Sequence, residues 1–343
     1  MPRRHLATLA LLVSGLVAAA PTAAAAPAPD TGTFTLLTYN VAGLPEPLSG
    51  SEPATNSPLI SPLLNAYDVV LLQEDWVDVL AQDGQRPAGT EDVPRTGYHD
   101  LVVRDADHAH RSTPMSSPPP PQNTVLRLPT GPTLSGDGLN HLSRLPLGDV
   151  TREMWDACHG EVSVTAIEEA LAAAGVDDPI EDIDGGSADC GAQKGFSVTT
   201  MELTDGATVH LYNLHADAGG HRNDIAARQQ NFEELARFVN AYSAGHAVIL
   251  GGDTNLKTGP GARDDATWTA FLDATGLADV CEVVACGDRA GAIDKVAFRD
   301  TSAIELVPQT HVFEEARFTR ADGEPLSDHP PLAVQFHWAI DAS

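Results

Sequence analysis

Short polar motifs stand at the ends of apolar, strand-like runs in this 343-residue chain. Asn40 closes the first such run and Glu74 closes the second. Further along, the segments Gly252–Asn255 and Ser327–Pro330 lie beside two more. Polar groups so far apart in the sequence can act together only if one fold gathers the strand ends, so the pattern predicts a single domain rich in β-strands.

The periodicity of apolar residues predicts the elements of that domain. Strands are predicted at residues 33–40, 68–73, 98–104, 139–143, 195–203, 208–214, 246–251, 293–298, 304–312 and 332–338. Helices are predicted at residues 58–66, 162–174, 222–243 and 265–275. The segment Thr204–Ala207 joins two strands and contains a glycine, which is typical of a hairpin turn.

The polar motifs carry the side chains that hydrolysis of a phosphate ester needs. A histidine such as His329 can accept a proton from water near neutral pH. A carboxylate such as Glu74 is a hard oxygen ligand that suits Mg²⁺, and a bound metal ion polarises a phosphoryl oxygen. Each residue alone is more often structural, but their combination indicates metal-assisted hydrolysis.

In chain order, the motifs resemble those of the endonuclease/exonuclease/phosphatase superfamily, which includes DNase I-like nucleases, inositol polyphosphate phosphatases and bacterial neutral sphingomyelinases. The resemblance covers about residues 33 to 338. It rests on Tyr39-Asn40, Gln73-Glu74, Leu142–Arg144, Asn213–His215, Gly252–Asn255, Ile293-Asp294 and Ser327–Pro330. It implies an α/β fold, a four-layer α/β/β/α sandwich of two packed mixed sheets, with the site at one end.

The resemblance also implies a catalytic role for each matching residue. His329 would be the general base, and Asp294 would fix its tautomer. Asp253 would orient the attacking water. Asn255 and His215 would contact the phosphoryl group, and the carboxylate that pairs with His215 in the family has no clear match here.

The metal ligands implied by the resemblance are Glu74, Asn40 and Asp328. Mg²⁺ is the expected cofactor, and Mn²⁺ or Ca²⁺ could substitute for it. Oxygen ligands of this kind suit these hard cations.

The residues around the motifs favour a lipid substrate over DNA. DNase-like members often carry a cation shortly after the Gln-Glu pair, whereas Asp75-Trp76 follows here, and an aromatic ring can stand against a choline-like head group. Lys194–Phe196 also resembles the sphingomyelinases. With 48 Asp and Glu against 20 Lys and Arg, the formal net charge is −28, which disfavours nucleic acid as a partner.

We therefore expect a phosphodiesterase that hydrolyses a phospholipid head-group diester, of sphingomyelinase or phospholipase C type. A secreted DNase I-like endonuclease and a phosphomonoesterase acting on a soluble metabolite are alternatives. A catalytically dead binding module on the same fold is a further one. The loops 42–58 and 105–137, which would shape the substrate pocket, contain no recognisable motif that identifies the substrate.

The N-terminus has the order of a secretory signal, with Arg3 and Arg4 before the apolar residues 6–20 and a small-residue tract after them. The apolar run is shorter than the roughly 20 residues that a membrane span needs. We expect a secreted monomer without a transmembrane segment, with the signal cleaved near Ala25. Residues 1–25 would then be the signal, 26–32 a short linker and 33–343 a single catalytic domain.

The chain has four cysteines, and an even number in a secreted chain predicts disulfides, with three connectivities open. Proximity favours Cys158 with Cys190 and Cys281 with Cys286. A zinc site is disfavoured because the spacings lack close Cys-x-x-Cys pairs.

Overall fold

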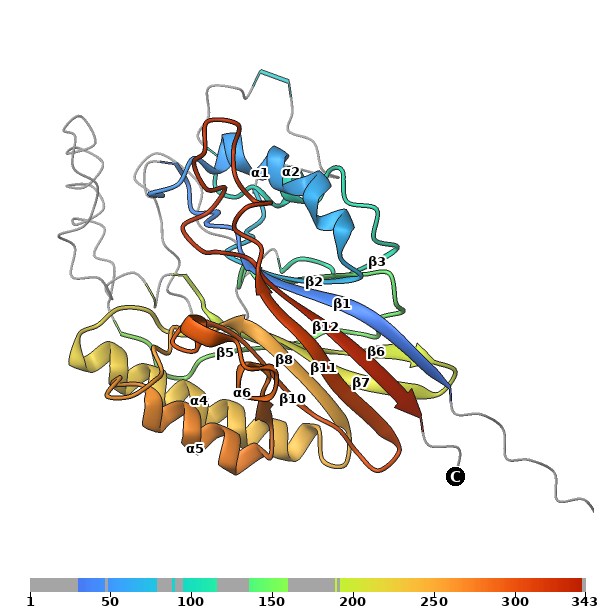
Figure 1. Ribbon diagram of the computed structural model, residues 1–343. Coiled ribbons are helices and arrows are strands. Elements are labelled where there is room, and N and C mark those ends of the chain that lie inside the picture. The colour runs from blue at the N-terminus through green and yellow to red at the C-terminus, as the bar shows by residue number, and fades with distance from the viewer. Residues whose placement is uncertain are drawn as a thin grey trace, which may run out of the picture.

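Two six-stranded mixed sheets pack face to face, and helices cover their outer faces (Figure 1). The structure is a computed structural model, and it describes residues 30–46, 49–78, 88–89, 95–115, 136–159, 189 and 192–340. Within these residues, no helix combines the length and the apolar character that crossing a membrane requires. The predicted four-layer α/β/β/α sandwich is confirmed.

The first sheet has the strand order β11-β12-β1-β2-β4-β3, in which only β1 and β2 pair in parallel. Its strands are β1 (Thr31–Asn40), β2 (Val69–Gln73), β3 (His110–Arg111), β4 (Asn140–Ser143), β11 (Ile304–Phe313) and β12 (Leu332–Ile340). The helices on this side are α1 (Pro53–Leu63), η1 (Leu64–Ala66) and α2 (His99–Val102).

The second sheet has the order β5-β6-β7-β8-β10-β9, and here only β7 and β8 pair in parallel. Its strands are β5 (Thr151–Met154), β6 (Gly195–Thr204), β7 (Ala207–His215), β8 (Ala247–Asp253), β9 (Ala278–Asp279) and β10 (Asp294–Arg299). The helices are α4 (Arg222–Tyr242), α5 (Asp265–Thr275), α6 (Val280–Val284) and η2 (Gly287–Arg289). In Figure 1, α4 and α5 run along the outer face of this sheet.

The central strands are apolar on both faces because both faces are covered. Leu36 of β1 packs between the sheets with Leu211 and Ile249, whereas its neighbour Leu37 packs against Ile60 of α1. Successive side chains of a strand point to opposite faces. A strand buried on both sides therefore reads as a continuous apolar run, which explains why these strands could be predicted.

Most predicted elements are found within a few residues of their predicted ends, and the hairpin turn at Thr204–Ala207 is confirmed. The predicted helix 58–66 begins earlier, at Pro53, and ends as the short η1. The predicted strand 98–104 is wrong, because this segment contains helix α2. The backbone N–H groups of Tyr98 and His99 donate to the Trp76 carbonyl instead of to a neighbouring strand.

Three short strands, β3, β5 and β9, were not predicted, since runs of two to four residues carry no clear alternation. The predicted helix 162–174 lies outside the described residues. The Cys281–Cys286 disulfide is confirmed. Cys158 is also disulfide-bonded, but its predicted partner Cys190 lies outside the described residues.

Candidate active site

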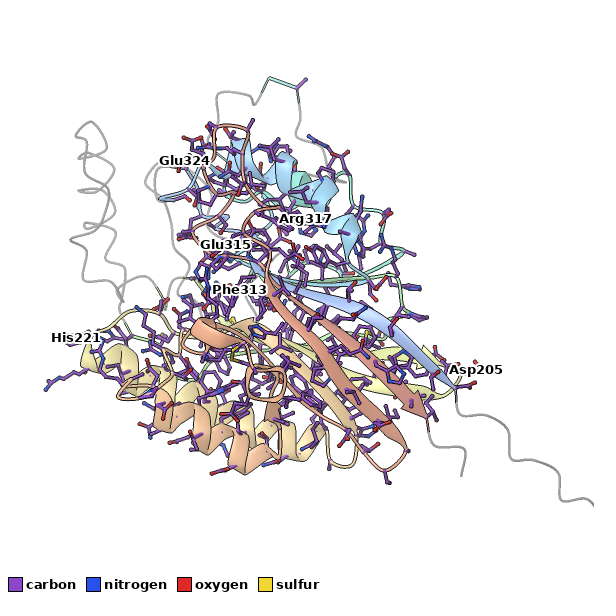
Figure 2. The ribbon with its side chains drawn as sticks, viewed as in Figure 1. Asp205, His221, Phe313, Glu315, Arg317 and Glu324 are labelled. Carbon is purple, nitrogen blue, oxygen red and sulfur yellow. A yellow bond between two sulfur atoms is a disulfide. The ribbon has the colours of Figure 1, made fainter. Side chains whose placement is uncertain are left out.

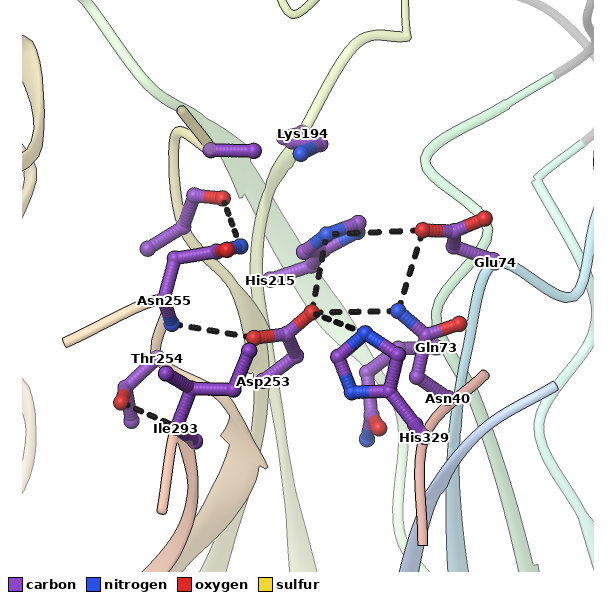
Figure 3. A network of polar contacts seen from close by, with 12 residues as sticks. Asn40, Gln73, Glu74, Lys194, His215, Asp253, Thr254, Asn255, Ile293 and His329 are labelled. Carbon is purple, nitrogen blue, oxygen red and sulfur yellow. Dashed lines mark hydrogen bonds and ion pairs between the residues drawn. The ribbon is translucent and has the colours of Figure 1, made fainter. Parts of the chain in front are cut away.

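Strand direction brings the predicted site residues to one end of the sandwich. His215 and Asp253 are the last residues of the parallel strands β7 and β8 and stand opposite each other. Asp294 begins β10, which is antiparallel to β8, so its register also places it opposite Asp253. In the other sheet, Asn40 ends β1 and Glu74 follows the parallel strand β2. The two sheets thus deliver polar groups to one small volume (Figure 3).

Asp253 lies at the centre of this network, and its side chain is almost fully buried. Its Oδ2 atom accepts a hydrogen bond from Asn40 Nδ2 at 3.1 Å. The same atom lies 3.4 Å from His215 Nε2 and 3.6 Å from His329 Nε2. Burial alone would raise the pKa of Asp253, but the charges of His329 and Lys194 and the hydrogen bond from Asn40 hold this pKa below its ordinary value. Asp253 is therefore an ionised carboxylate at neutral pH.

His329 forms a carboxylate–imidazole pair with Asp294, with 2.9 Å between Nδ1 and Oδ2. Burial alone would lower the pKa of His329, but Asp253 and Asp294 raise it to about 10. Burial raises the pKa of Asp294 to about 6. Because Asp294 occupies Nδ1, the other ring nitrogen, Nε2, is the one directed toward Asp253.

Glu74 is held at the rim of the network in a left-handed backbone conformation, with φ of 54°. Such a conformation is uncommon for a residue with a side chain and is often found at functional sites. Glu74 Oε1 accepts a hydrogen bond from Asn40 Nδ2 at 3.0 Å and lies 3.8 Å from His215 Nε2. A Cβ at Gly43 would lie 2.3 Å from the Glu74 carbonyl oxygen, so this loop packs closely against Glu74.

Asn255 is the second site residue with a left-handed backbone, with φ of 51°. Its backbone N–H donates to Asp253 Oδ1 at 3.0 Å, and its Nδ2 donates to the Ala216 carbonyl at 3.0 Å. These two bonds fix the position of the Asn255 amide beside Asp253.

Two of the three predicted metal ligands, Asn40 and Glu74, are hydrogen-bonded to each other, and the charge of the third, Asp328, helps to raise the pKa of Glu74. Asn40 lies beside Glu74, but its Oδ1 accepts from the Ala42 N–H at 3.0 Å, so its amide nitrogen faces the Glu74 carboxylate. Asp328 is exposed, and its carboxylate accepts a hydrogen bond from Ser327 Oγ at 3.3 Å.

The site can accept a cation on two grounds. Burial raises the pKa of Glu74, which shows that the charged carboxylate is poorly compensated in this position, although Lys194 and Asn40 oppose the shift. Separately, ligand atoms of Asp253, Asp294 and His329 all lie within 4.8 Å of one another. Since the His329–Asp294 pair already uses Nδ1, Glu74 is the more available donor, and its hard oxygen atoms fit Mg²⁺.

Lys194 is a site residue that the motifs did not assign. Its buried ammonium pairs with Asp189, with 2.5 Å between Nζ and Oδ1, and it lies beside the network in Figure 3. Burial would lower the pKa of Lys194, but Asp189 and Glu74 raise it, so Lys194 stays charged. The Lys194–Phe196 segment was the available signal, but sequence alone does not show that this lysine points inward.

His215 is neutral, because burial and the charge of Lys194 lower its pKa well below the ordinary value. Its Nδ1 has no hydrogen-bond partner among the described residues, so its pairing carboxylate is still unassigned.

Known proteins resemble this chain in sequence and in fold. No protein-family model matches the chain. A sphingomyelinase of Mycobacterium bovis is 29% identical over 325 residues, which cover 90% of this chain and 54% of that relative. A sphingomyelinase of Mycobacterium tuberculosis gives the same values. The chain thus spans about half the length of the curated relatives that it matches.

Two solved structures show the fold. A double mutant of the beta toxin of Staphylococcus aureus with bound magnesium ions is 14% identical, with a TM-score of 0.52, and the match covers 88% of this chain and 99% of that one. An endonuclease/exonuclease/phosphatase protein of Beutenbergia cavernae is 17% identical, with a TM-score of 0.52 and coverage of 90% and 72%. The fold is the DNase I-like sandwich. The fold that the sequence resemblance implied is therefore confirmed, and sphingomyelinases are among the proteins similar in sequence.

Proposed function

We propose that this chain is a secreted, Mg²⁺-dependent phosphodiesterase that hydrolyses a phospholipid head-group diester, as a sphingomyelinase or phospholipase C does. The observation that carries the proposal is the His329–Asp294 pair beside the ionised Asp253, with Glu74 in the same network. The names of the curated relatives and the net charge of −28 favour a lipid over a nucleic acid.

Water activation is assigned to Asp253 and His329. Their facing atoms, Oδ2 and Nε2, are 3.6 Å apart, so one water can hydrogen-bond to both. Asp253 would orient this water and His329 would take its proton. Asp294 keeps the proton of the neutral imidazole on Nδ1 and stabilises the imidazolium that forms.

The base must be neutral before it can act, and the pKa of about 10 means that His329 is protonated at neutral pH when no other cation is near. Positive charge that enters the site lowers this pKa, because like charges repel. Mg²⁺ held at Glu74, with Asn40 beside it, would supply that charge and act as a Lewis acid on a phosphoryl oxygen. Metal binding and base activation are therefore linked.

Three further groups can stabilise charge on the phosphoryl oxygens. Neutral His215 and the Asn255 amide can donate hydrogen bonds. The Lys194 ammonium lies close enough to influence both Glu74 and Asp253 electrostatically. All of these groups are held by buried contacts, which limits reorganisation during the reaction.

A substrate panel tests the proposal. The protein lacking residues 1–25 would be incubated with sphingomyelin, phosphatidylcholine, a glycerophosphodiester and plasmid DNA, with Mg²⁺ or with EDTA. We expect Mg²⁺-dependent release of a phosphorylated head group without nicking of the plasmid. Nicking without head-group release would identify a nuclease and refute the lipid assignment.

A further inference from the structure

A second cluster of metal-ligating side chains shares no residue with the candidate active site. Ligand atoms of Cys281, Cys286 and His311 all lie within 4.8 Å of one another. The two cysteines form a disulfide, with 4.9 Å between their Cα atoms, and they stand near the start of α6 and shortly after its end. His311 belongs to β11, the edge strand of the first sheet, and α6 contacts this strand (Figure 1). An imidazole from one sheet thus lies beside a disulfide attached to the other.

Reduction of this disulfide would turn the cluster into a set of metal ligands. A dithiol that reduces the S–S bond gives up two electrons and becomes a disulfide itself, while Cys281 and Cys286 become thiols. Thiols lose their protons when they bind a metal, and two thiolates with one imidazole suit Zn²⁺. The sequence separation of the two cysteines is 5, which is the Cys-x4-Cys spacing found in zinc sites. The sequence did not reveal the third ligand, because His311 comes from a distant strand.

His311 is in the form that binds a metal. Burial lowers the pKa of His311, so its ring is neutral at neutral pH. The ring packs edge-on against that of Phe313, at the end of β11, with 5.5 Å between ring centroids (Figure 2). His311 and Cys286 are partly exposed, so a reductant and a metal ion can reach them.

An acidic cavity gives a cation a route to the cluster. It has a volume of about 560 Å³, and Cys281 forms part of its wall. No lysine or arginine is among the lining residues that the structure describes, whereas four carboxylates are, those of Asp265, Asp273, Asp279 and Glu282. Carboxylates that line one hollow raise the local concentration of cations. The Asp279 carboxylate also accepts a hydrogen bond from the Cys281 N–H at 2.8 Å, so negative charge lies next to the cluster itself.

We propose that Cys281, Cys286 and His311 bind Zn²⁺ when their disulfide is reduced, with water as the fourth ligand. Oxidation by a small disulfide reverses the step: the S–S bond forms, Zn²⁺ leaves, and the oxidant takes two electrons from the thiolates and two protons from solvent to become two thiols. Zinc would join α6 to β11, a link that the disulfide does not make because both of its cysteines belong to one segment. This inference does not depend on the proposed function.

The first test titrates the reduced protein lacking residues 1–25 with Co²⁺, without oxygen, and then displaces Co²⁺ with Zn²⁺. A thiolate-to-cobalt charge-transfer band reports only metal bound to cysteine, so an ion at Glu74 does not contribute to it. We expect this band in the reduced wild type and not in the oxidised protein, and a roughly hundredfold lower Zn²⁺ affinity in His311→Ala. The control is His337→Ala, a partly exposed histidine of β12 that faces the other side of the sheet. Equal Zn²⁺ affinities in the two variants would overturn the site.

The second test identifies the cysteines, because reduction also opens the disulfide of Cys158. The reduced proteins are alkylated with iodoacetamide in the presence of Zn²⁺ or EDTA, and the labelled cysteines are mapped by mass spectrometry. Zn²⁺ should protect Cys281 and Cys286 in the wild type and in His337→Ala, but not in His311→Ala. Protection of the other two cysteines alone, or of none, would overturn the proposal.

The third test compares the Tm of the reduced wild type with Zn²⁺ and with EDTA. A metal that binds the folded protein stabilises it, so Zn²⁺ should raise the Tm of the wild type and leave that of His311→Ala unchanged. If reduction alone unfolds the wild type, Zn²⁺ should restore the near-ultraviolet circular dichroism of the oxidised protein. A reduced wild type that Zn²⁺ neither stabilises nor refolds would contradict the proposal.

Discussion

His215 and His329 both lie beside Asp253, yet they differ in charge. Burial and Lys194 lower the pKa of His215 well below its ordinary value. For His329, the carboxylates of Asp253 and Asp294 outweigh burial and raise the pKa to about 10. We therefore expect proton transfer at His329 and a neutral hydrogen-bonding role for His215.

Replacing Asp294 by Asn tests whether the charge of Asp294, and not only its packing, supports His329 as the base. The variant keeps the shape but removes the charge that raises the pKa of His329, so the acidic limb of the rate profile should move to lower pH. The maximal kcat should fall by roughly 10²- to 10⁴-fold, because the imidazole loses its partner. A pH series of kcat at saturating Mg²⁺ measures both effects. The control is Asp300→Asn, an exposed residue directly after the other end of β10. An Asp294→Asn profile equal to that of the control would refute the pairing.

Glu74→Gln should weaken Mg²⁺ binding without abolishing hydrolysis. The neutral amide retains an oxygen but loses the charge that binds Mg²⁺, so activity should be lost at low Mg²⁺ and partly restored at high Mg²⁺. Titration of activity with Mg²⁺ in wild type and variant gives the apparent affinity. Identical titration curves would mean that Glu74 is not the ligand.

Motif identity predicted most of these residues because their chemistry follows from the residue type. It did not predict the inward position of Lys194 or the orientation of the Asn40 amide. Those depend on contacts between segments distant in sequence, such as the ion pair of Lys194 with Asp189 beside Glu74.

The backbones of β7 and β8 approach each other closely at the strand ends that carry the site. Gly252 of β8 has φ of 153°, and a Cβ at this position would lie 2.1 Å from the Leu214 carbonyl oxygen of β7. Since Asp253 is the next residue, the approach of β7 and β8 helps to fix the position of Asp253 relative to His215.

Gly252→Ala should therefore destabilise the protein, by about 2–4 kcal/mol, through a forced shift of one strand. The Tm from circular dichroism should fall well below that of Gly50→Ala, where an added Cβ meets no atom within 4 Å. Equal Tm values for the two variants would contradict the close approach.

Elements with continuous apolar runs were predictable because both faces are buried, as in β1 and β8. The segment 98–104 has a similar short apolar run but forms the helix α2. Two backbone hydrogen bonds to the Trp76 carbonyl determine its conformation. Trp76 lies outside this segment, so the sequence of the segment alone could not predict that contact.

At the scale of the whole molecule, an amide pair buried beneath the site connects the two sheets. Gln73 Nε2 of β2 donates to Asn213 Oδ1 of β7 at 2.7 Å, and Asn213 Nδ2 donates to the Leu72 carbonyl at 2.8 Å. Both side chains are fully buried. These bonds align the sheet that carries Glu74 with the sheet that carries His215.

Asn213→Ala should lower the free energy of unfolding by about 2–3 kcal/mol, because buried groups on both sheets lose their partners. It should also lower kcat, since the two halves of the site lose their common support. Urea unfolding and kcat are measured together, with the exposed Asn240→Ala as control. A variant as stable and as active as the control would show that the amide pair does not align the sheets.

The assignment of His329 as the base is tested by phosphocholine release from sphingomyelin, with wild type and His329→Ala each assayed with Mg²⁺ and with EDTA. We expect release only by the wild type with Mg²⁺, while His329→Ala keeps the wild-type Tm and loses activity by several orders of magnitude. Release by a folded His329→Ala at a rate near that of the wild type would contradict the assignment of the base.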